Sequence, residues 1–307
     1  LYCPRCATPL SNFEIAMDNS YKDVSDPSVF VKFKLIDREE SILAWTTTPW
    51  TLPTNFALGI SPDETYVTVE VEGEKLILAK SRVTAVFGDT PHHHHQEFEG
   101  RTLVGLSYEP LYQYYPSKPQ DHQVYEADFV SMDDGTGVVH IAPGFGEDDT
   151  ALGLEHDLTM IESVDDEGKL DPAIEVAQNF FFKKADKYIL EDLTNRKKIY
   201  KLEKIVHSYP HCWRCGTPLL YKAQDAWYLK IQNIKDDLLK SNQKINWVPD
   251  YFKDGRFKLG IDSAPDWCIS RSRYWGSPLP VWECECGERF VPNSIADLEK
   301  ASGQKVD

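Results

Sequence analysis

Hydroxyl side chains crowd one short stretch near the start of the chain. Residues 45–55 read Trp-Thr-Thr-Thr-Pro-Trp-Thr-Leu-Pro-Thr-Asn, which combines threonine hydroxyls with one carboxamide. Each hydroxyl can both donate and accept a hydrogen bond, and Pro49 and Pro53 disfavour a regular helix. A row of hydroxyls on a proline-braced turn could hold a water molecule or the hydroxyls of a sugar. The plainer interpretation is a threonine-rich strand edge.

A second stretch combines an imidazole with acids. Residues 135–149 read Gly-Thr-Gly-Val-Val-His-Ile-Ala-Pro-Gly-Phe-Gly-Glu-Asp-Asp. His140 follows apolar residues in what reads as a strand, so it could line a pocket or be a satisfied core histidine. Acids in the first turn of a helix complement its dipole, so Asp148 could simply be an N-cap.

Four of the seven cysteines form two Cys-x-x-Cys pairs. Cys3 and Cys6 lie far in sequence from Cys212 and Cys215, yet both pairs are followed closely by Thr-Pro-Leu. Two such pairs can supply the four sulfurs of a structural Zn²⁺ site, and an ion held in this way would join the two ends of a large insertion. Disulfide or redox chemistry is the alternative, and His211 could substitute as a ligand. Residues 284–287 open a second knuckle without a partner pair.

Short apolar segments separated by turn residues predict a mixed α+β chain that is mainly β. The hydrophobic content of 41% and aromatic content of 12% suit a packed core. Histidines 92–95 are expected to form a loop tract. Strands are expected at 28–36, 40–46, 102–108, 122–130 and 138–142, a hairpin at 65–78, and helices at 80–87, 150–156 and 184–198.

Together, the two polar stretches resemble signatures of the editing domain of isoleucyl-tRNA synthetases, a class I family. Residues 45–55 resemble its threonine-rich peptide, and residues 135–149 its G-T-G-x-V-H-x-A-P-x-x-G-x-D-D motif. The valyl and leucyl enzymes, with T-T-R-P in place of residues 47–50, are less similar. The resemblance implies a β-barrel-like editing domain flanked by zinc-ribbon segments and a partial return to the nucleotide-binding catalytic body. The implied segments are 1–20 and 205–232 for the zinc clip, 21–204 for the editing domain, and 233–307 for a truncated connective or catalytic-body part.

Other parts of the chain fit the same family. Residues 221–230, 245–249 and 266–282 resemble class I segments that flank the second half of the catalytic body. The chain contains neither His-Ile-Gly-His nor Lys-Met-Ser-Lys-Ser, the two ATP-handling signatures of the class. We therefore expect a piece of a longer synthetase that does not itself activate an amino acid.

The resemblance implies an ester hydrolase that removes valine from the 3′-terminal adenosine of tRNA(Ile), and that could also clear valyl-adenylate. In this interpretation Asp149 binds the α-ammonium of the substrate, and His140 binds the substrate or orients water. Trp45 lines the substrate pocket. The remaining polar residues hold the adenosine and position the attacking water: Thr46, Thr47, Thr48, Thr51 and Asn55. The expected partners are this tRNA and the rest of the parent chain.

Two other functions remain open from sequence. The first is a non-catalytic zinc-ribbon module that binds tRNA, and the second is a zinc hydrolase that uses His140 and the 92–95 tract. A formal net charge of −16 is awkward for RNA binding. Bases nevertheless gather in 183–204, either as a local RNA-binding face or as a solvated helix surface. With no apolar run near 18 residues, we expect a cytoplasmic monomer without membrane contact.

Overall fold

The computed structural model describes residues 1–18, 20–270, 272 and 277–305. The chain divides into two compact units, Leu1–Gln224 and Asp225–Asp307. The class I resemblance at 266–282 falls partly on 271 and 273–276, which lie outside the described residues. The expected four-part division of the chain stays a prediction.

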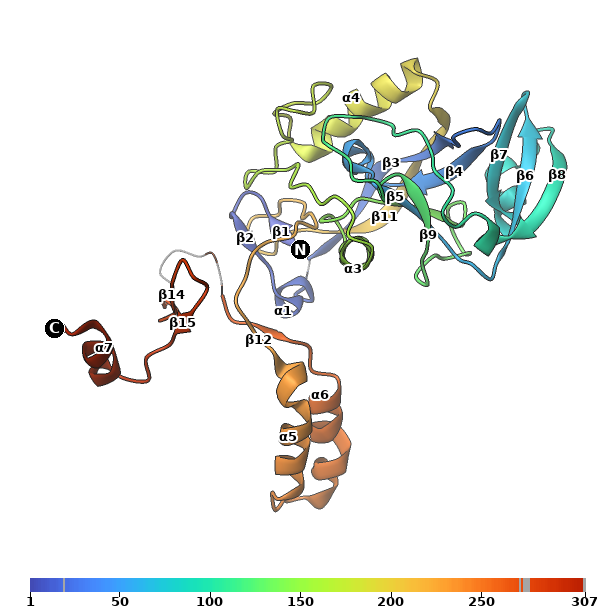
Figure 1. Cartoon of the computed structure of the whole chain (residues 1–307). Helices are drawn as coiled ribbons and strands as arrows, with labels where there is room; N and C mark the ends of the chain where they lie inside the picture. The colour runs from blue at the N-terminus through green and yellow to red at the C-terminus, as the bar shows by residue number, and fades with distance from the viewer. Residues whose placement is uncertain (19, 271, 273–276, 306–307) are drawn as a thin grey trace. The chain divides into compact units, whose positions relative to one another are not determined.

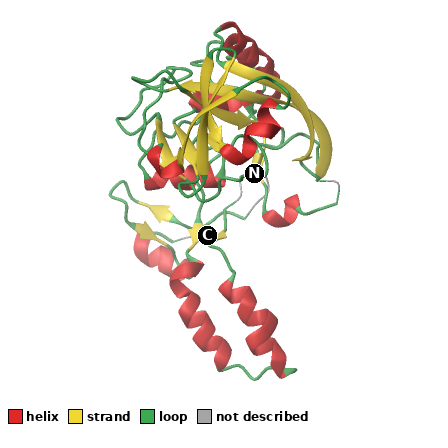
Figure 2. Ribbon diagram, turned by 90° about the vertical axis from the view of Figure 1, so that its right-hand side faces the viewer, coloured by secondary structure: helices red, strands yellow, loops and turns green. Residues whose placement is uncertain are grey.

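One curved mixed sheet organises the first unit (Figures 1 and 2). Its order is β8-β6-β7-β4-β10-β5-β9, with β3 paired to β4 and β11 paired to β3. The strand order does not close on itself, but the fold is mainly β with helices added, as expected. The strands are β3 (Tyr21–Lys34), β4 (Ser41–Thr46), β5 (Ala57–Ile60), β6 (Thr65–Val71), β7 (Glu74–Ala79), β8 (His93–Glu99), β9 (Gln123–Glu126), β10 (Val138–Ile141) and β11 (Ile199–Pro210).

Strand β4 brings the two polar stretches together. Along one edge it pairs with β3, and its other edge is shared between β7 at its start and β10 at its end. In this register Val139 of β10 lies beside Trp45 of β4. The threonine run that follows β4 and the histidine at 140 are therefore neighbours in space, although about ninety positions separate them.

Apolar packing fixes the helices and turns around the sheet. The main core contains buried residues of β3, β4 and β5 together with the apolar face of α4 (Phe182–Asn195). A second cluster packs α2 (Val83–Phe87), which follows the short 3-10 turn η2 (Lys80–Arg82), onto β6 and β7. A third places α3 (Glu147–Glu155) against β5 and β10. Burial of apolar surface, at roughly 25 cal/mol per Å², stabilises each of these contacts.

Most of the expected elements are confirmed, and three are corrected. The hairpin exists as β6 and β7, and the helices at 80–87, 150–156 and 184–198 exist with shifted ends. Residues 102–108 are not a strand: the 3-10 turn η3 (Gly100–Thr102) precedes them, and Gly105 has a φ of +79°, which breaks an extended path. The strand at 122–130 is limited to β9, and His93–His95 belong to the exposed edge strand β8 instead of a loop.

The second unit is built from short elements. A helical hairpin contains α5 (Ile231–Gln243) and α6 (Lys258–Asp262), joined through the turns η4 (Asp250–Phe252) and η5 (Lys253–Phe257). The strands of its described residues form two antiparallel pairs, β12 (Tyr228–Leu229) with β13 (Trp267–Cys268), and β14 (Trp282–Glu283) with β15 (Arg289–Phe290). Helix α7 (Ile295–Ser302) follows. The partial return to a nucleotide-binding body stays a prediction.

No helix in the described part of the chain is both long enough and apolar enough to cross a membrane.

Candidate functional site

The threonine run turns directly after β4. Pro49 starts the 3-10 turn η1 (Pro49–Thr54), whose residues are all buried. The backbone N–H of Thr48 donates to Thr46 Oγ1 at 3.1 Å, and the hydroxyls of Thr46 and Thr48 are 3.1 Å apart. Thr48 Oγ1 is also 3.3 Å from Thr51 Oγ1. The turn thus arranges three hydroxyls in a continuous row.

His140, on β10, contacts the last hydroxyl of this row. Its Nε2 lies 2.7 Å from Thr51 Oγ1, and its Nδ1 lies 3.1 Å from the amide nitrogen of Asn55. The Asn55 amide can only donate to Nδ1, so the proton of the neutral ring belongs on Nε2 and is donated to Thr51. The Thr51 hydroxyl then donates to the carbonyl oxygen of Thr48 at 2.8 Å. Both ring nitrogens are engaged inside the protein.

Asn55 is held on its other side by a residue that the sequence did not single out. The hydroxyl of Tyr108 donates to Asn55 Oδ1 at 2.7 Å, and the Asn55 amide also donates to the carbonyl oxygen of Ala57 at 2.8 Å. Tyr108 is fully buried, in a segment outside the named strands whose backbone bonds to Leu35, just beyond β3, and to the region of β9. No motif surrounds Tyr108 in the sequence, so only the fold reveals it.

Asp149 lies in the first turn of α3. Its Oδ1 accepts the N–H of Ala142 at 2.8 Å, two residues beyond His140 along the chain. Gly146 is the N-cap of this helix, and Asp148 is not. Gly146 leaves room for this carboxylate, because a Cβ there would overlap Asp149 Oδ2 and force it to shift. Asp149 is therefore fixed to the end of the strand that carries His140.

Burial shifts the pKa values of these two groups in opposite directions. Desolvation lowers the pKa of His140 to about 4, so the ring is neutral near pH 7. Desolvation raises the pKa of Asp149 to about 6, although the hydrogen bond from Ala142 acts in the other direction. Asp149 is therefore mostly ionised near pH 7, and it would gain from a cationic partner.

A cavity of about 280 Å³ opens beside the threonine run. Trp45, Thr46 and Thr47 form one wall, and Phe129 and the segment 134–139 contribute to the rest. The side chain of Thr47 has no hydrogen-bond partner among the residues that the structure describes, so its hydroxyl is available to a ligand. His140 and Asp149 do not line this cavity. The structure thus brings His140 against Thr51 but leaves the shared chamber with Asp149 as a prediction.

The four paired cysteines meet in space. Their Sγ atoms all lie within 4.8 Å of one another, and those of Cys3 and Cys215 are 3.5 Å apart. Zn–S bonds of about 2.3 Å would place tetrahedral ligands about 3.8 Å apart, which fits this spacing. Backbone hydrogen bonds between Tyr2 and Leu220 join the two segments as well. His211 is directed elsewhere, with Nδ1 2.9 Å from the carbonyl oxygen of Tyr209.

The zinc-hydrolase interpretation finds no matching geometry. Strands β6, β7 and β4 lie between β8, which carries His93–His95, and β10, which carries His140. Within the described residues, His140 belongs to no group of three or more metal-ligating side chains.

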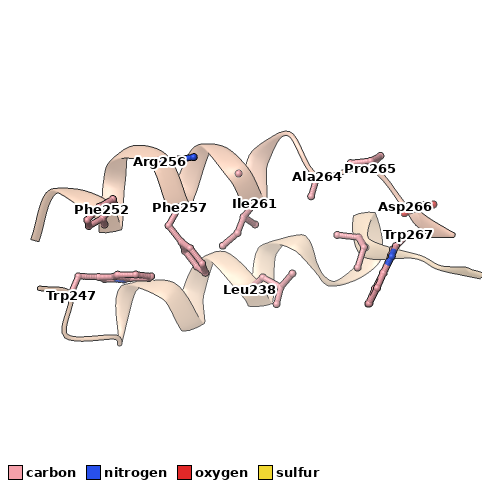
Figure 3. A pocket seen from close by; sticks show the side chains of 12 residues that line it. Leu238, Trp247, Phe252, Arg256, Phe257, Ile261, Ala264, Pro265, Asp266 and Trp267 are labelled. Carbon is pink, nitrogen blue, oxygen red and sulfur yellow. The ribbon is translucent and has the colours of Figure 1, made fainter. Parts of the chain in front are cut away.

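A larger cavity of about 690 Å³ lies in the second unit, between α5 and α6 (Figure 3). Its walls are apolar, with Leu238, Trp247, Phe257 and Trp267 pointing into it. It contains none of the polar residues singled out from sequence. Size alone therefore does not make it the site of the chemistry discussed here.

Sequence comparisons with known proteins identify one family. A family model described as tRNA synthetases class I (I, L, M and V) matches residues 1–306. The isoleucine–tRNA ligase of Clostridium acetobutylicum is 48% identical over 300 residues, covering 97% of this chain and 29% of the relative. The isoleucine–tRNA ligase of Thermus thermophilus is 43% identical over 306 residues, covering 97% of this chain and 29% of the relative. The chain thus spans less than a third of these relatives. The crystal structure of GlLeuRS-CP1 has a TM-score of 0.47 at 13% identity, covering 57% of this chain and 99% of that one.

Proposed function

The chain belongs to the class I tRNA synthetases of the isoleucine, leucine, methionine and valine group, and from this premise we propose that it edits the products of an isoleucyl-tRNA synthetase. The proposed reaction is hydrolysis of the ester that joins valine to the 3′-terminal adenosine of tRNA(Ile). Valyl-adenylate is the second proposed substrate. Isoleucine is supported as the cognate amino acid because the similar relatives are isoleucine–tRNA ligases.

The observation that carries the proposal is the hydrogen bond between Thr51 and His140. It joins the two stretches that resemble editing-domain signatures into one buried network, which continues through Asn55 to Tyr108. A network without a charged member is suited to hold hydroxyl groups in fixed positions rather than to move protons. This favours a site that works by positioning water and a sugar.

Each part of the substrate has a proposed partner. The carboxylate of Asp149 binds the α-ammonium, since a hydrogen bond to a charged group contributes about 1.5–3 kcal/mol. Thr46 and Thr47, on the wall of the 280 Å³ cavity, hold the terminal adenosine and the attacking water beside Trp45. Thr48 and Thr51 continue the row of hydroxyls, and a ribose hydroxyl of the tRNA assists.

His140 supports this site without acting as a base. Its pKa of about 4 leaves it neutral, and both of its nitrogens are already engaged. Its proposed contribution is to fix the Thr51 hydroxyl, while Asn55 and Tyr108 fix the ring. The rate enhancement then comes from orientation of the water and from polar stabilisation of the developing oxyanion.

The need for such a site follows from the size of the amino acids. Valine lacks one methylene of isoleucine, and a binding pocket discriminates a methylene by only about 1–3 kcal/mol, a limit for which this pair is the standard case. A second, smaller site that admits valine and excludes isoleucine overcomes this limit.

We further propose that Cys3, Cys6, Cys212 and Cys215 bind one structural Zn²⁺. Four sulfur ligands complete its coordination and leave no open position for a substrate. The ion would hold the two ends of the first unit together, next to the backbone hydrogen bonds between Tyr2 and Leu220. It has no part in the hydrolysis.

Deacylation of purified esters tests the proposal. The 307-residue chain should release valine from valyl-tRNA(Ile) and leave isoleucyl-tRNA(Ile) intact, and valyl-adenylate can be assayed alongside. Binding of tRNA without release of valine, even at high protein concentration, would identify the chain as a non-catalytic tRNA-binding module instead.

A further inference from the structure

Helix α4 carries an acid, Asp186, that hydrogen-bonds to the backbone of the threonine turn. Asp186 is 5% exposed, and its Oδ1 accepts the backbone N–H of Trp50 at 2.9 Å. Trp50 is the second residue of the 3-10 turn η1, where backbone N–H groups have no partner inside the turn. The carboxylate of Asp186 therefore supplies a bond that the turn cannot make for itself.

The position of Asp186 on its helix is unusual for an acid. Spacings of three and four residues place it on the face of α4 that also carries Phe182, Ile189 and Leu193, all of which are buried. Asp186 thus occupies a core position that an apolar residue would fill at lower desolvation cost. The hydrogen bond from the backbone of Trp50 compensates for part of this cost.

The ring of Trp50 is fixed by apolar contacts alone. It packs edge-on against Phe182 of α4 at 5.1 Å and against Phe145 at 5.2 Å between ring centroids. Its indole nitrogen is buried and has no hydrogen-bond partner among the described residues. The hydrogen bond from the Trp50 backbone to Asp186 therefore fixes the position of the backbone of the turn, whereas the ring contacts fix only the side chain.

The same residue lies between the two halves of the proposed site. Trp50 directly precedes Thr51, whose hydroxyl meets His140 at 2.7 Å. Phe145, which also contacts the ring of Trp50, comes four residues before Asp149 in the loop that leads into α3. A shift of Trp50 would displace both the Thr51 hydroxyl and the start of that helix.

We propose that Asp186 is a positioning residue for the hydrolytic site: by accepting the backbone N–H of Trp50, it sets the register of the threonine turn against His140. This rests on the proposed function. Asp186 touches no substrate. It acts through Trp50 on Thr51, so its loss should impair the chemical step more than the binding of substrate.

The charges near Asp186 guide the choice of variants. The positive charge of Lys183 lowers the pKa of Asp186, and the negative charge of Asp26 raises it. Lys183 and Asp26 also form an ion pair with each other at 2.5 Å. Desolvation outweighs these effects and raises the pKa of Asp186 to about 7. The group is thus partly neutral near pH 7, and what Trp50 requires is an acceptor oxygen, not a full charge. Asp186→Asn keeps that oxygen, whereas Asp186→Leu removes it at similar volume.

The kinetic arm of the test compares these two variants with a matched control. In Asp186→Leu we expect kcat for valyl-tRNA(Ile) to fall by about tenfold to a hundredfold with KM little changed, because misplacement by about 1 Å costs on this scale. Asp186→Asn should retain kcat within about threefold of wild type. Glu191→Leu, on the exposed part of the same helix, should leave both parameters unchanged. Equal losses in the Asn and Leu variants, or none in the Leu variant, would overturn the proposal.

The spectroscopic arm does not depend on hydrolysis. In the wild-type chain the Trp50 amide should exchange slowly with solvent, and the His140 ring ¹⁵N signals should move in Asp186→Leu but not in Asp186→Asn. An unprotected Trp50 amide would overturn the proposal even if Asp186→Leu fails to fold. If wild type itself releases no valine, the proposed function fails, while these signals still decide the role of Asp186.

Discussion

Thr51 Oγ1 lies 2.7 Å from Nε2 of His140, although 89 positions separate the two residues along the chain. The strand pairing of β4 with β10 produces this contact, since it places Val139 beside Trp45. The tautomer that Asn55 imposes makes His140 the donor and Thr51 the acceptor. From this contact, and from the way Asp149 is fixed two residues farther along, the predictions below follow.

Neutralising Asp149 should abolish most of the editing activity without unfolding the chain. Asp149→Asn keeps an oxygen for the N–H of Ala142 but loses the charge that binds the α-ammonium. We expect kcat/KM for valyl-tRNA(Ile) to fall by about tenfold to a hundredfold, which corresponds to about 1.5–3 kcal/mol of charge-assisted bonding. Asp148→Asn, one residue earlier and exposed, serves as the control. Normal turnover in Asp149→Asn would remove the role assigned to this carboxylate.

The activity should also depend on pH through the same group. Because burial raises the pKa of Asp149 to about 6, its ionised fraction decreases as the pH falls through that value. The kcat/KM of the wild-type chain, which reports the free enzyme, should therefore fall below about pH 6. The profile of Asp149→Asn should be flat across this range. A wild-type profile that is equally flat would show that the ionisation of Asp149 does not limit the reaction.

Two threonines of the same turn should respond differently to loss of the hydroxyl. Thr51→Val leaves the Nε2–H of His140 buried without an acceptor, so the free energy of unfolding should fall by about 1–3 kcal/mol. Thr47→Val removes a hydroxyl that has no partner among the described residues, so stability should change by less than about 0.5 kcal/mol. Activity should fall in both variants. Denaturant unfolding and deacylation measured on the same samples give the comparison, and equal stabilities would contradict the assigned network.

Gly146 should not tolerate a side chain. Its φ of −167° is open to any residue, so the cost of Gly146→Ala comes from overlap of the new Cβ with Asp149 Oδ2. We expect a displaced carboxylate and a loss of kcat/KM that approaches that of Asp149→Asn. The control is Gly260→Ala, because a Cβ there meets nothing within 4 Å. Full activity in Gly146→Ala would indicate that the carboxylate functions in a different position.

Metal analysis should find one zinc ion per chain. Cys6→Ser should lower the zinc content and the Tm, by roughly 2–4 °C for each kcal/mol of stability lost, whereas Cys284→Ser should change neither. Deacylation should survive in any fraction that remains folded. Loss of activity on chelation with an unchanged circular dichroism spectrum would instead support the zinc-hydrolase interpretation.

The sequence singled out the polar residues of the candidate site but not the residues that support them. Motif residues such as Thr51, Asn55 and His140 could be singled out because side-chain type and spacing suggest chemistry. Tyr108 could not, because its loop has no periodic pattern. Asp186 did carry a signal, since its spacing from Phe182 and Leu193 places it on the apolar face of α4.

The helices and strands also differ in how well the sequence predicts them. Strong alternation predicted the β6–β7 hairpin, whereas the apolar residues of 102–108 suggested a strand that Gly105 does not allow. The contact between β4 and β10 depends on strand order across the whole sheet, which local pattern does not encode. This is why the proximity of the two stretches, central to the site, had to come from the resemblance and then from the structure.

A structure of the chain with a non-hydrolysable valyl-adenosine analogue tests the central claim most directly. We predict the α-ammonium within about 3 Å of the Asp149 carboxylate, at hydrogen-bonding distance, with the adenosine against Thr46 and Thr47. An analogue bound elsewhere, for example in the apolar cavity between α5 and α6, with Asp149 still in contact only with Ala142, would contradict the claim that the two stretches form one site.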